Sequence, residues 1–347
     1  MRVAVTFNMK RGEPDEAQEP PGSRSDAEAE WDSPKTIAAV VNALQERHEV
    51  IPIDAAKDVY HGLVASRPEM VFNIAEGSAG PCREGHVPSI LEYLNIPYTA
   101  SDPLTLNLCL DKARAKEVLA FNRLPTPRFR VISAEKISKN GLSYPVIVKP
   151  LYEGSSMGIC NNSLVRSHEE MHERVRWVLD EYNEPALVEE YMAGREFTVA
   201  ILGNGPSARV LPIVEIKFDS LPEGMNPIYS YEAKWIWDQP SNPLQIFECP
   251  AQLDGKLRSE IERICLKAYA VMRCRDWCRI DVRLDAAGRP HILELNPLPG
   301  ILPCPEDNSC FPKAARAAGL SYNQLINEVL HIACARYGIG QWEDMIA

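Results

Sequence analysis

The sequence predicts an α/β protein with three domains, in which a small N-terminal parallel sheet is followed by two α+β domains. Two observations lead to this fold class. The N-terminal third alternates short apolar runs with helical segments, which is the pattern of a β-α-β-α-β unit. The remainder alternates β-branched runs with amphipathic helices and ends near a β-hairpin. We place the domains at residues 1–103, 104–200 and 201–347, with Asp102-Pro103 as the first boundary.

Composition and charge narrow the function classes. The 347 residues carry a net charge of −11, so the protein's own field opposes binding to nucleic acid or to an anionic membrane. No apolar run reaches the roughly 18 residues of a membrane span, and the first strand lacks a signal-peptide pattern. The ten cysteines are scattered and match no zinc pattern. We therefore expect a cytoplasmic protein with reduced cysteines and small-molecule ligands.

Three apolar runs predict the strands of the N-terminal sheet: residues 2–7, 50–53 and 70–74. Helical segments at 34–47 and near residue 61 separate them. Residues 10–34 form an insert rich in Pro, Glu and Asp, which predicts a mobile loop. Because the insert follows the carboxyl end of a strand, where open α/β sheets bind ligands, it either covers a substrate or forms plain disordered surface.

A glycine-rich turn at residues 73–80 follows the third strand and contains Glu76. Such a turn either holds a small polar ligand or simply connects two elements. Beyond it we expect helices at 88–94 and 110–121, the second ended by Leu124-Pro125.

A β-branched run at residues 144–150 carries Lys149, and a loop of small residues follows at 151–159. The lysine supplies a point charge and the loop supplies backbone N–H groups, so the two suit a flexible flap over phosphates. The alternative is an ordinary β-hairpin. A Walker A loop is excluded, because no Gly-Lys-Ser/Thr sequence appears and no helix begins there.

Two further strands, at 186–192 and 194–201, have acidic residues at their joint, which either accept hydrogen bonds from adenine and ribose or form ordinary surface. Residues 203–208 match a loose dinucleotide fingerprint, but Pro206 and the strand after it predict a hairpin turn. Residues 217–243 are irregular and aromatic, which is typical of a lid. Two helices complete the prediction: residues 252–273 and 312–337, with Ser321 as a cap.

Two alternating runs, at residues 279–284 and 291–296, flank a turn segment centred on Ala287-Gly288 and predict a β-hairpin. One face then carries two opposed pairs: Asp281 with Glu294, and Arg279 with Asn296. The other face carries four apolar side chains: Ile280, Val282, Leu293 and Leu295.

The two opposed carboxylates of this hairpin repel each other, so we expect a cation between them. Carboxylate and amide oxygens are hard ligands, which favour Mg²⁺ over zinc, with phosphates and water completing the shell. The alternative is a solvated hairpin face.

The order of these elements resembles the ATP-grasp superfamily, and within it the D-alanine–D-alanine ligases. The lysine strand, Glu-Gly-Ser-Ser-Met-Gly flap, acidic joint, aromatic lid, Arg-Ile-Asp run and Glu-Leu-Asn end follow one another between residues 70 and 337. The resemblance implies an ATP-grasp fold whose last two domains clasp ATP, and a ligase that forms a peptide (C–N) bond between two amino acids through an acyl phosphate. It also implies Mg²⁺, with Mn²⁺ as a substitute, a role in cell-wall biogenesis, and a homodimer, which is common in the family.

The resemblance assigns roles to single positions. At ATP it implies Lys112, Lys149, Ser155 and Ser156 on the phosphates, Glu189 on the adenine amino group, the Met192 backbone on the ring and Glu196 on the ribose. The implied metal ligands are Asp281, Glu294 and Asn296. The implied catalytic groups are Arg279, the Gly300 backbone, the flap Ser155 and the lid Lys234. The implied substrate residues are Glu76, Trp235 and Ser309.

The sequence departs from the family around the substrate. Glu76-Gly77 stands in place of a His-Gly pair, and Trp235 replaces the lid tyrosine. The glutamate that holds the first amino group is unassigned within the insert, with Glu28 and Glu30 as candidates. The segment 301–310 is also longer than usual.

These departures leave other functions open. The first alternative is an ATP-grasp ligase for other amino or carboxylic acids in a tailoring or natural-product pathway. A non-catalytic nucleotide-binding module is a second alternative, and a regulatory or structural protein a third. Amine-dependent release of ADP separates the ligases from the other two.

Overall fold

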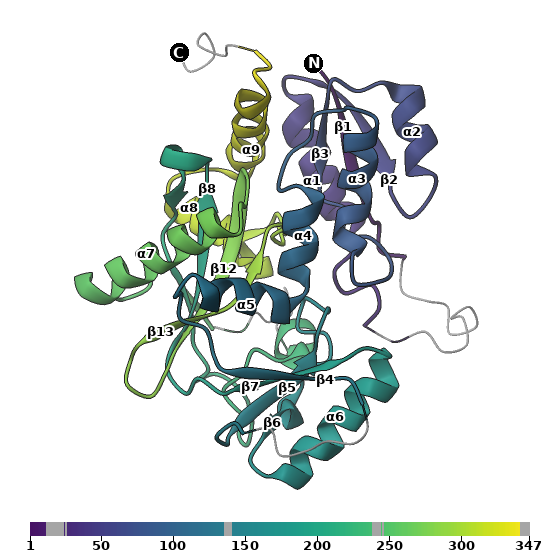
Figure 1. Ribbon diagram of the computed structural model, residues 1–347. Coiled ribbons are helices and arrows are strands. Elements are labelled where there is room, and N and C mark those ends of the chain that lie inside the picture. The colour runs from purple at the N-terminus through teal and green to yellow at the C-terminus, as the bar shows by residue number, and fades with distance from the viewer. Residues whose placement is uncertain (12–23, 25, 135–140, 238–243, 245, 341–347) are drawn as a thin grey trace.

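The computed structural model describes residues 1–11, 24, 26–134, 141–237, 244 and 246–340 (Figure 1). The N-terminal domain contains a parallel sheet in the order β2-β1-β3. Its strands are β1 (Arg2–Phe7), β2 (Glu49–Asp54) and β3 (Met70–Asn73). Its helices are α1 (Pro34–Gln45), α2 (Val59–Ser66) and α3 (His86–Tyr93). The predicted β-α-β-α-β unit is confirmed.

Helix α1 shows how the sequence sets these elements. The Ser33 hydroxyl accepts a hydrogen bond from the N–H of Thr36, and Pro34 occupies the first turn, where its missing N–H costs nothing. The side chains of Val40 and Leu44 then pack into the same core as Val3 and Val5 of β1. The cap therefore sets where the helix begins, and the apolar spacing sets which face is buried.

Residues 103–121 form two helices, α4 (Pro103–Leu110) and α5 (Lys112–Phe121). Only the second was predicted. Asp111 separates them, and its carboxylate accepts hydrogen bonds from the N–H groups of Ala113 and Arg114. This cap begins α5 at Lys112, so the lysine stands at the first helical position.

The central domain contains an antiparallel sheet in the order β4-β7-β5-β6, with α6 (His168–Tyr182) on one face (Figure 1). Its strands are β4 (Phe129–Ile132), β5 (Val146–Pro150), β6 (Leu164–Val165) and β7 (Ala186–Glu190). Met171, Val175 and Val178 of α6 are fully buried with the valines of β5 and β7. The helix and sheet thus form a separate small core below α5.

The C-terminal domain contains a sheet in the order β11-β10-β8-β12-β13, and β9 pairs with β8. Its strands are β8 (Glu196–Leu202), β9 (Arg209–Val210), β10 (Val214–Ile216), β11 (Phe247–Glu248), β12 (Trp277–Leu284) and β13 (Pro290–Asn296). Its helices are α7 (Gly255–Val271), α8 (Cys310–Ala317) and α9 (Tyr322–Tyr337). Strand β8 runs across the expected boundary at residue 200 and pairs with β12.

Short helical turns complete the fold. Four are 3-10 turns: Arg83–Gly85, Asn161–Ser163, Gly205–Ser207 and Pro305–Asp307. The turn at Gly205–Ser207 joins the antiparallel strands β8 and β9, so the dinucleotide-like sequence lies in a hairpin, as predicted. The predicted tail helix is instead two helices, and Ser321 caps the second as expected.

The outer domains share one core. Trp277 of β12 lies fully buried between Phe72 of β3 and Phe311 of α8, with ring centroids 5.8 and 5.6 Å away. Helix α9 packs along α1, and residues of both helices belong to the same apolar cluster. In the described parts of the chain, none of the helices has the length and apolar character that crossing a membrane requires.

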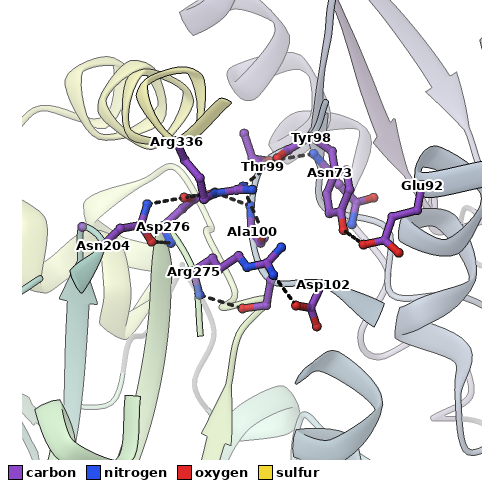
Figure 2. A network of polar contacts seen from close by, with 12 residues as sticks. Asn73, Glu92, Tyr98, Thr99, Ala100, Asp102, Asn204, Arg275, Asp276 and Arg336 are labelled. Atoms are coloured by element: carbon purple, nitrogen blue, oxygen red, sulfur yellow. Dashed lines mark hydrogen bonds and ion pairs between the residues drawn. The ribbon is translucent and has the colours of Figure 1, made fainter. Parts of the chain in front are cut away.

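A buried polar network fixes this joint (Figure 2). The fully buried carboxylate of Asp276 accepts hydrogen bonds from Arg336, Asn204 and the backbone N–H of Ala100, at 2.7 to 3.0 Å. Arg336 also donates to the carbonyl of Tyr98, 2.9 Å away. Because Tyr98 and Ala100 belong to the N-terminal domain, one buried ion pair holds the two outer domains in a fixed orientation.

Two predicted loops are described in part. In the 10–34 insert, residues 12–23 and 25 lie outside the described residues. The described ends of the insert meet, because Lys10 N–H donates to Asp32 O at 2.9 Å and Asp32 N–H to Asn8 O at 2.8 Å. In the predicted lid, residues 238–243 lie outside the described residues, and the described part contains a π-helical turn, Glu232–Trp237.

Candidate active site

The hairpin of β12 and β13 forms the floor of a cavity, and the register of the hairpin is the predicted one. Arg279 pairs with Asn296 and Asp281 pairs with Glu294. A β-bulge follows, because Val282 pairs with Ile292, and Leu293 is the extra residue. Leu293 therefore lines the cavity while Ile292 is fully buried. The expectation that Leu293 lies on the apolar face was wrong, since one inserted residue reverses the alternation.

The acidic pair on this floor is surrounded by cations. Arg279 donates to both oxygens of Asp281, at 3.1 and 2.9 Å, and lies 3.9 Å from Glu294. The amide of Asn296 is 3.3 Å from Asp281. Burial by itself would raise the pKa of Glu294, but Lys112 and Lys149 outweigh it and hold the pKa below the ordinary range. Glu294 is thus a desolvated carboxylate kept ionised by neighbouring lysines, whereas burial raises the pKa of Asp281.

Two lysines above the floor share one buried carboxylate. Both oxygens of Glu189 on β7 are engaged, by Lys149 of β5 and by Lys116 of α5, each at 2.7 Å. Sequence reasoning missed Lys116, although its spacing of four residues from Lys112 puts both lysines on one helix face. The adenine contact expected of Glu189 stays a prediction. Lys112 itself donates to the carbonyl of Glu153 in the flap.

The flap and the lid touch each other over the cavity. Ser155 and Ser156 adopt left-handed conformations, with φ of 48° and 61°. The Ser156 hydroxyl donates to the carbonyl of Tyr229 at 2.9 Å, and the Trp235 indole donates to the carbonyl of Ser155 at 3.0 Å. The flap connects β5 to β6, and these two strands pair antiparallel. Flap and lid therefore form one roof.

Three residues predicted near the reacting groups lie together at one end of the cavity. Lys234 is half-buried, and desolvation together with Arg279 lowers its pKa to about 8. The Ser309 hydroxyl donates to the carbonyl of Gly300 at 3.0 Å and accepts from the N–H of Leu302 at 3.2 Å. Ser309 thus fixes the backbone turn that follows β13.

Met192, which follows β7, and Glu196, the first residue of β8, also line the cavity. Glu196 pairs with Arg283 at 2.7 Å, and Arg283 also donates to the Tyr191 hydroxyl at 2.7 Å. Arg283 was not predicted, because the alternation of β12 alone does not reveal which acid it meets on β8.

The N-terminal loop reaches the cavity through Glu30, which pairs with Arg83 at 2.7 Å. A Cβ added at Gly154 would lie 1.9 Å from Glu30 Oε1, so the Glu30 carboxylate packs directly against the flap at this glycine. Glu28 instead pairs with Arg11 and is not among the cavity-lining residues. Of the two candidates for the amino-group glutamate, the fold therefore favours Glu30.

Glu76 was predicted to contact a substrate, but it is not among the residues that line the cavity. The N–H of Gly77 donates to Asn8 and its carbonyl accepts from the Trp31 indole, so the turn is held by the protein itself. Burial, with Glu84 and Glu30 adding to it, raises the pKa of Glu76. Asn296 and Lys112 are also outside the lining, but Asn296 donates a hydrogen bond to Asp281 and Lys112 lowers the pKa of Glu294. The other residues to which the resemblance assigns roles line the cavity.

All three domains contribute to this cavity, whose volume is about 400 Å³. The described residues contain no group of three His, Cys, Asp or Glu that could hold a metal, so a metal here would need the Asn296 amide beside the two carboxylates. That set consists of hard oxygen donors, which fits Mg²⁺ with phosphate and water ligands. Lysines above an acidic floor suit the binding of a polyanion through a divalent cation.

Comparisons with known proteins agree with this arrangement. Residues 118–331 match the model of the D-ala D-ala ligase C-terminus. The chain is 37% identical to the uncharacterized protein y4sG of Sinorhizobium fredii, over 88% of this chain and 90% of that protein. It is 36% identical to the D-alanine–D-alanine ligase of Bordetella petrii over 78% of each chain, and 31% identical to that of Pelotomaculum thermopropionicum over 88% and 93%.

A solved structure shows the same fold. The D-alanine–D-alanine ligase of Bacillus anthracis complexed with ATP superimposes with a TM-score of 0.72, covering 98% of this chain and 100% of that one. The sequence identity is 22%, so this likeness concerns the ATP-grasp fold.

Proposed function

The chain belongs to the D-alanine–D-alanine ligase family, and from this premise we propose that it joins two amino acids in an ATP-dependent reaction. The observation that carries the proposal is the floor of Arg279, Asp281 and Glu294 beneath Lys149 and a roof of flap and lid. This arrangement suits a bound triphosphate next to a reacting carboxylate. A nucleotide-binding module would not need Arg279 aimed along the acidic pair.

In the first step, the carboxylate of one amino acid attacks the γ-phosphate of ATP and becomes an acyl phosphate, and ADP is the leaving group. Lys149 and Lys112 neutralise phosphate charge, and Arg279 stabilises the charge that builds up on the acyl group. Asp281, Glu294 and Asn296 would hold Mg²⁺, which would neutralise negative charge on the phosphates. Mn²⁺ would fit the same oxygen ligands.

In the second step, the amine of the other amino acid attacks the acyl carbon and phosphate leaves. The backbone N–H of Gly300 and the Arg279 guanidinium would stabilise the oxyanion that forms. An acyl phosphate is lost if water reaches it. The bonds between flap and lid, through Ser156 and Trp235, support a role of the roof in excluding water.

ADP release measured with D-alanine, the substrate in the relatives' names, tests this function, and mass spectrometry identifies the dipeptide. Asp281→Asn and Glu294→Gln should each abolish amino-acid-dependent ADP release. Glu190→Gln is the matched control, because Glu190 also lies in the cavity lining but pairs with the exposed Arg128. Full activity in Asp281→Asn, or no product from any amino acid pair with the parent protein, would refute the proposal.

From the family we also propose a cytoplasmic location, a role in cell-wall biogenesis and a homodimer. Light scattering of the purified protein measures its mass directly. A mass of twice 38.8 kDa supports the dimer, and a mass of 38.8 kDa contradicts it.

A further inference from the structure

Charged side chains in the cavity are almost all paired. Six pairs account for most of them: Glu30–Arg83, Lys149–Glu189, Glu190–Arg128, Glu196–Arg283, Arg279–Asp281 and Asp307–Lys35. Among the described residues, no ion pair includes Lys10, Asp32 or Lys234. Lys234 belongs to the lid and is one of the catalytic groups that the family resemblance implies. The proposed reaction gives no role to Lys10 or Asp32.

Lys10 reaches the cavity from a part of the chain that the reaction does not need. It follows β1 at the start of the long insert, and its backbone N–H is bonded to Asp32. Its ammonium lies 4.4 Å from the ring centroid of Trp235, which also lines the cavity. A tryptophan face attracts cations more strongly than tyrosine does, so the ring holds the ammonium inside the cavity.

The protein gives the ammonium of Lys10 no ion-pair partner among the described residues. Burial lowers the pKa of Lys10, and Asp32 and Glu28 oppose that effect from beyond ion-pair distance. Burial also raises the pKa of Asp32 to about 7, so near neutral pH this carboxyl is only partly ionised. Neither acid therefore fully neutralises the lysine. A partly buried cation without a bonded acceptor is costly unless a ligand supplies one.

We infer that Lys10 binds the side-chain carboxylate of a substrate, so that one of the two amino acids joined by this protein is dicarboxylic. The inference rests on the proposed function and deepens it. The main-chain carboxylate and amine are met by groups already assigned, namely Arg279, Lys234 and Glu30. A methyl side chain would leave Lys10 without an acceptor, and sites built to bond a polar group discriminate strongly against substrates that lack it.

Steady-state kinetics of substrate preference test the inference. D-alanine is paired with D-aspartate, D-glutamate or a second D-alanine, and the L-enantiomers are run in parallel. The parent protein should show a higher kcat/KM with a dicarboxylic partner. Lys10→Met should lower the dicarboxylic-to-alanine ratio of kcat/KM by about 10- to 100-fold, the loss expected for a charged hydrogen bond. Lys57→Met, an exposed lysine paired with Asp54, should leave the ratio unchanged.

A charge reversal makes the test independent of any loss of stability. Lys10→Glu should shift the preference toward a diamino acid such as D-ornithine, a gain that misfolding cannot produce. The inference is overturned if the parent protein prefers alanine and Lys10→Met leaves the dicarboxylic-to-alanine ratio of kcat/KM unchanged. The ligase function would still stand in that case, and Lys10 would only balance the charge of Asp32. Absence of product with every pair would instead refute the ligase function.

Discussion

Replacing Asp276 should weaken the contact between the N-terminal and C-terminal domains. This carboxylate is fully buried and accepts four hydrogen bonds, two of them from Arg336. Asp276→Ala leaves the Arg336 guanidinium, the Asn204 amide and the Ala100 N–H without their acceptor. Removing one partner of a buried ion pair costs about 3–5 kcal/mol, so we expect a loss of free energy of unfolding of that size.

Urea unfolding followed by tryptophan fluorescence measures the loss, because Trp277 lies in the shared core next to the joint. Glu117→Ala is the control, since Glu117 pairs with Arg114 and both side chains are exposed, by 49% and 64%, and such pairs contribute about 0–1 kcal/mol. The N-terminal domain supplies Glu30 to the cavity, so Asp276→Ala should also raise KM for the amino acids more than KM for ATP. A loss no larger than that of Glu117→Ala would refute the account of the joint.

Three further predictions concern the cavity. Glu189→Gln leaves Lys116 and Lys149 without their shared carboxylate, so we expect a loss of about 3–5 kcal/mol in unfolding free energy and weaker ATP binding by calorimetry; unchanged stability would contradict the pairing. Arg283→Met frees Glu196 and should raise KM for ATP roughly tenfold, equivalent to about 1.4 kcal/mol, while an unchanged KM argues against a nucleotide role for this end. Lys234 acts as a cation, so kcat/KM should fall as pH rises through its pKa of about 8, and Lys234→Arg should remove this alkaline limb.

Local pattern was sufficient where neighbouring residues decide the structure. The turn at Ala287-Gly288 and the strand alternation correctly placed Asp281 opposite Glu294. The bulge at Leu293 was not predictable in the same way, because an inserted residue changes the face of a side chain without changing the composition of the strand. The cap at Asp111 likewise divides a segment that contains no proline or glycine break.

Long-range pairing accounts for the remaining errors. The ion pair of Lys116 with Glu189 joins residues far apart in the sequence, and their separate patterns carry no information about each other. Glu76 lies in a turn that could equally bind a ligand or the protein, and only the bonds of Gly77 to Asn8 and Trp31 distinguish the two. Glu30 and Glu28 differ in the arginine each meets, which depends on the path of the insert.

The central claim is that a carboxylate is activated by phosphoryl transfer over the Arg279, Asp281 and Glu294 floor. Transfer of label from an amino acid whose carboxylate carries ¹⁸O tests this most directly. If the carboxylate attacks the γ-phosphate, one of its labelled oxygens leaves with the phosphate when the peptide bond forms, and mass spectrometry of the released phosphate should show one ¹⁸O atom. Phosphate that carries no label, released together with dipeptide, would contradict the account.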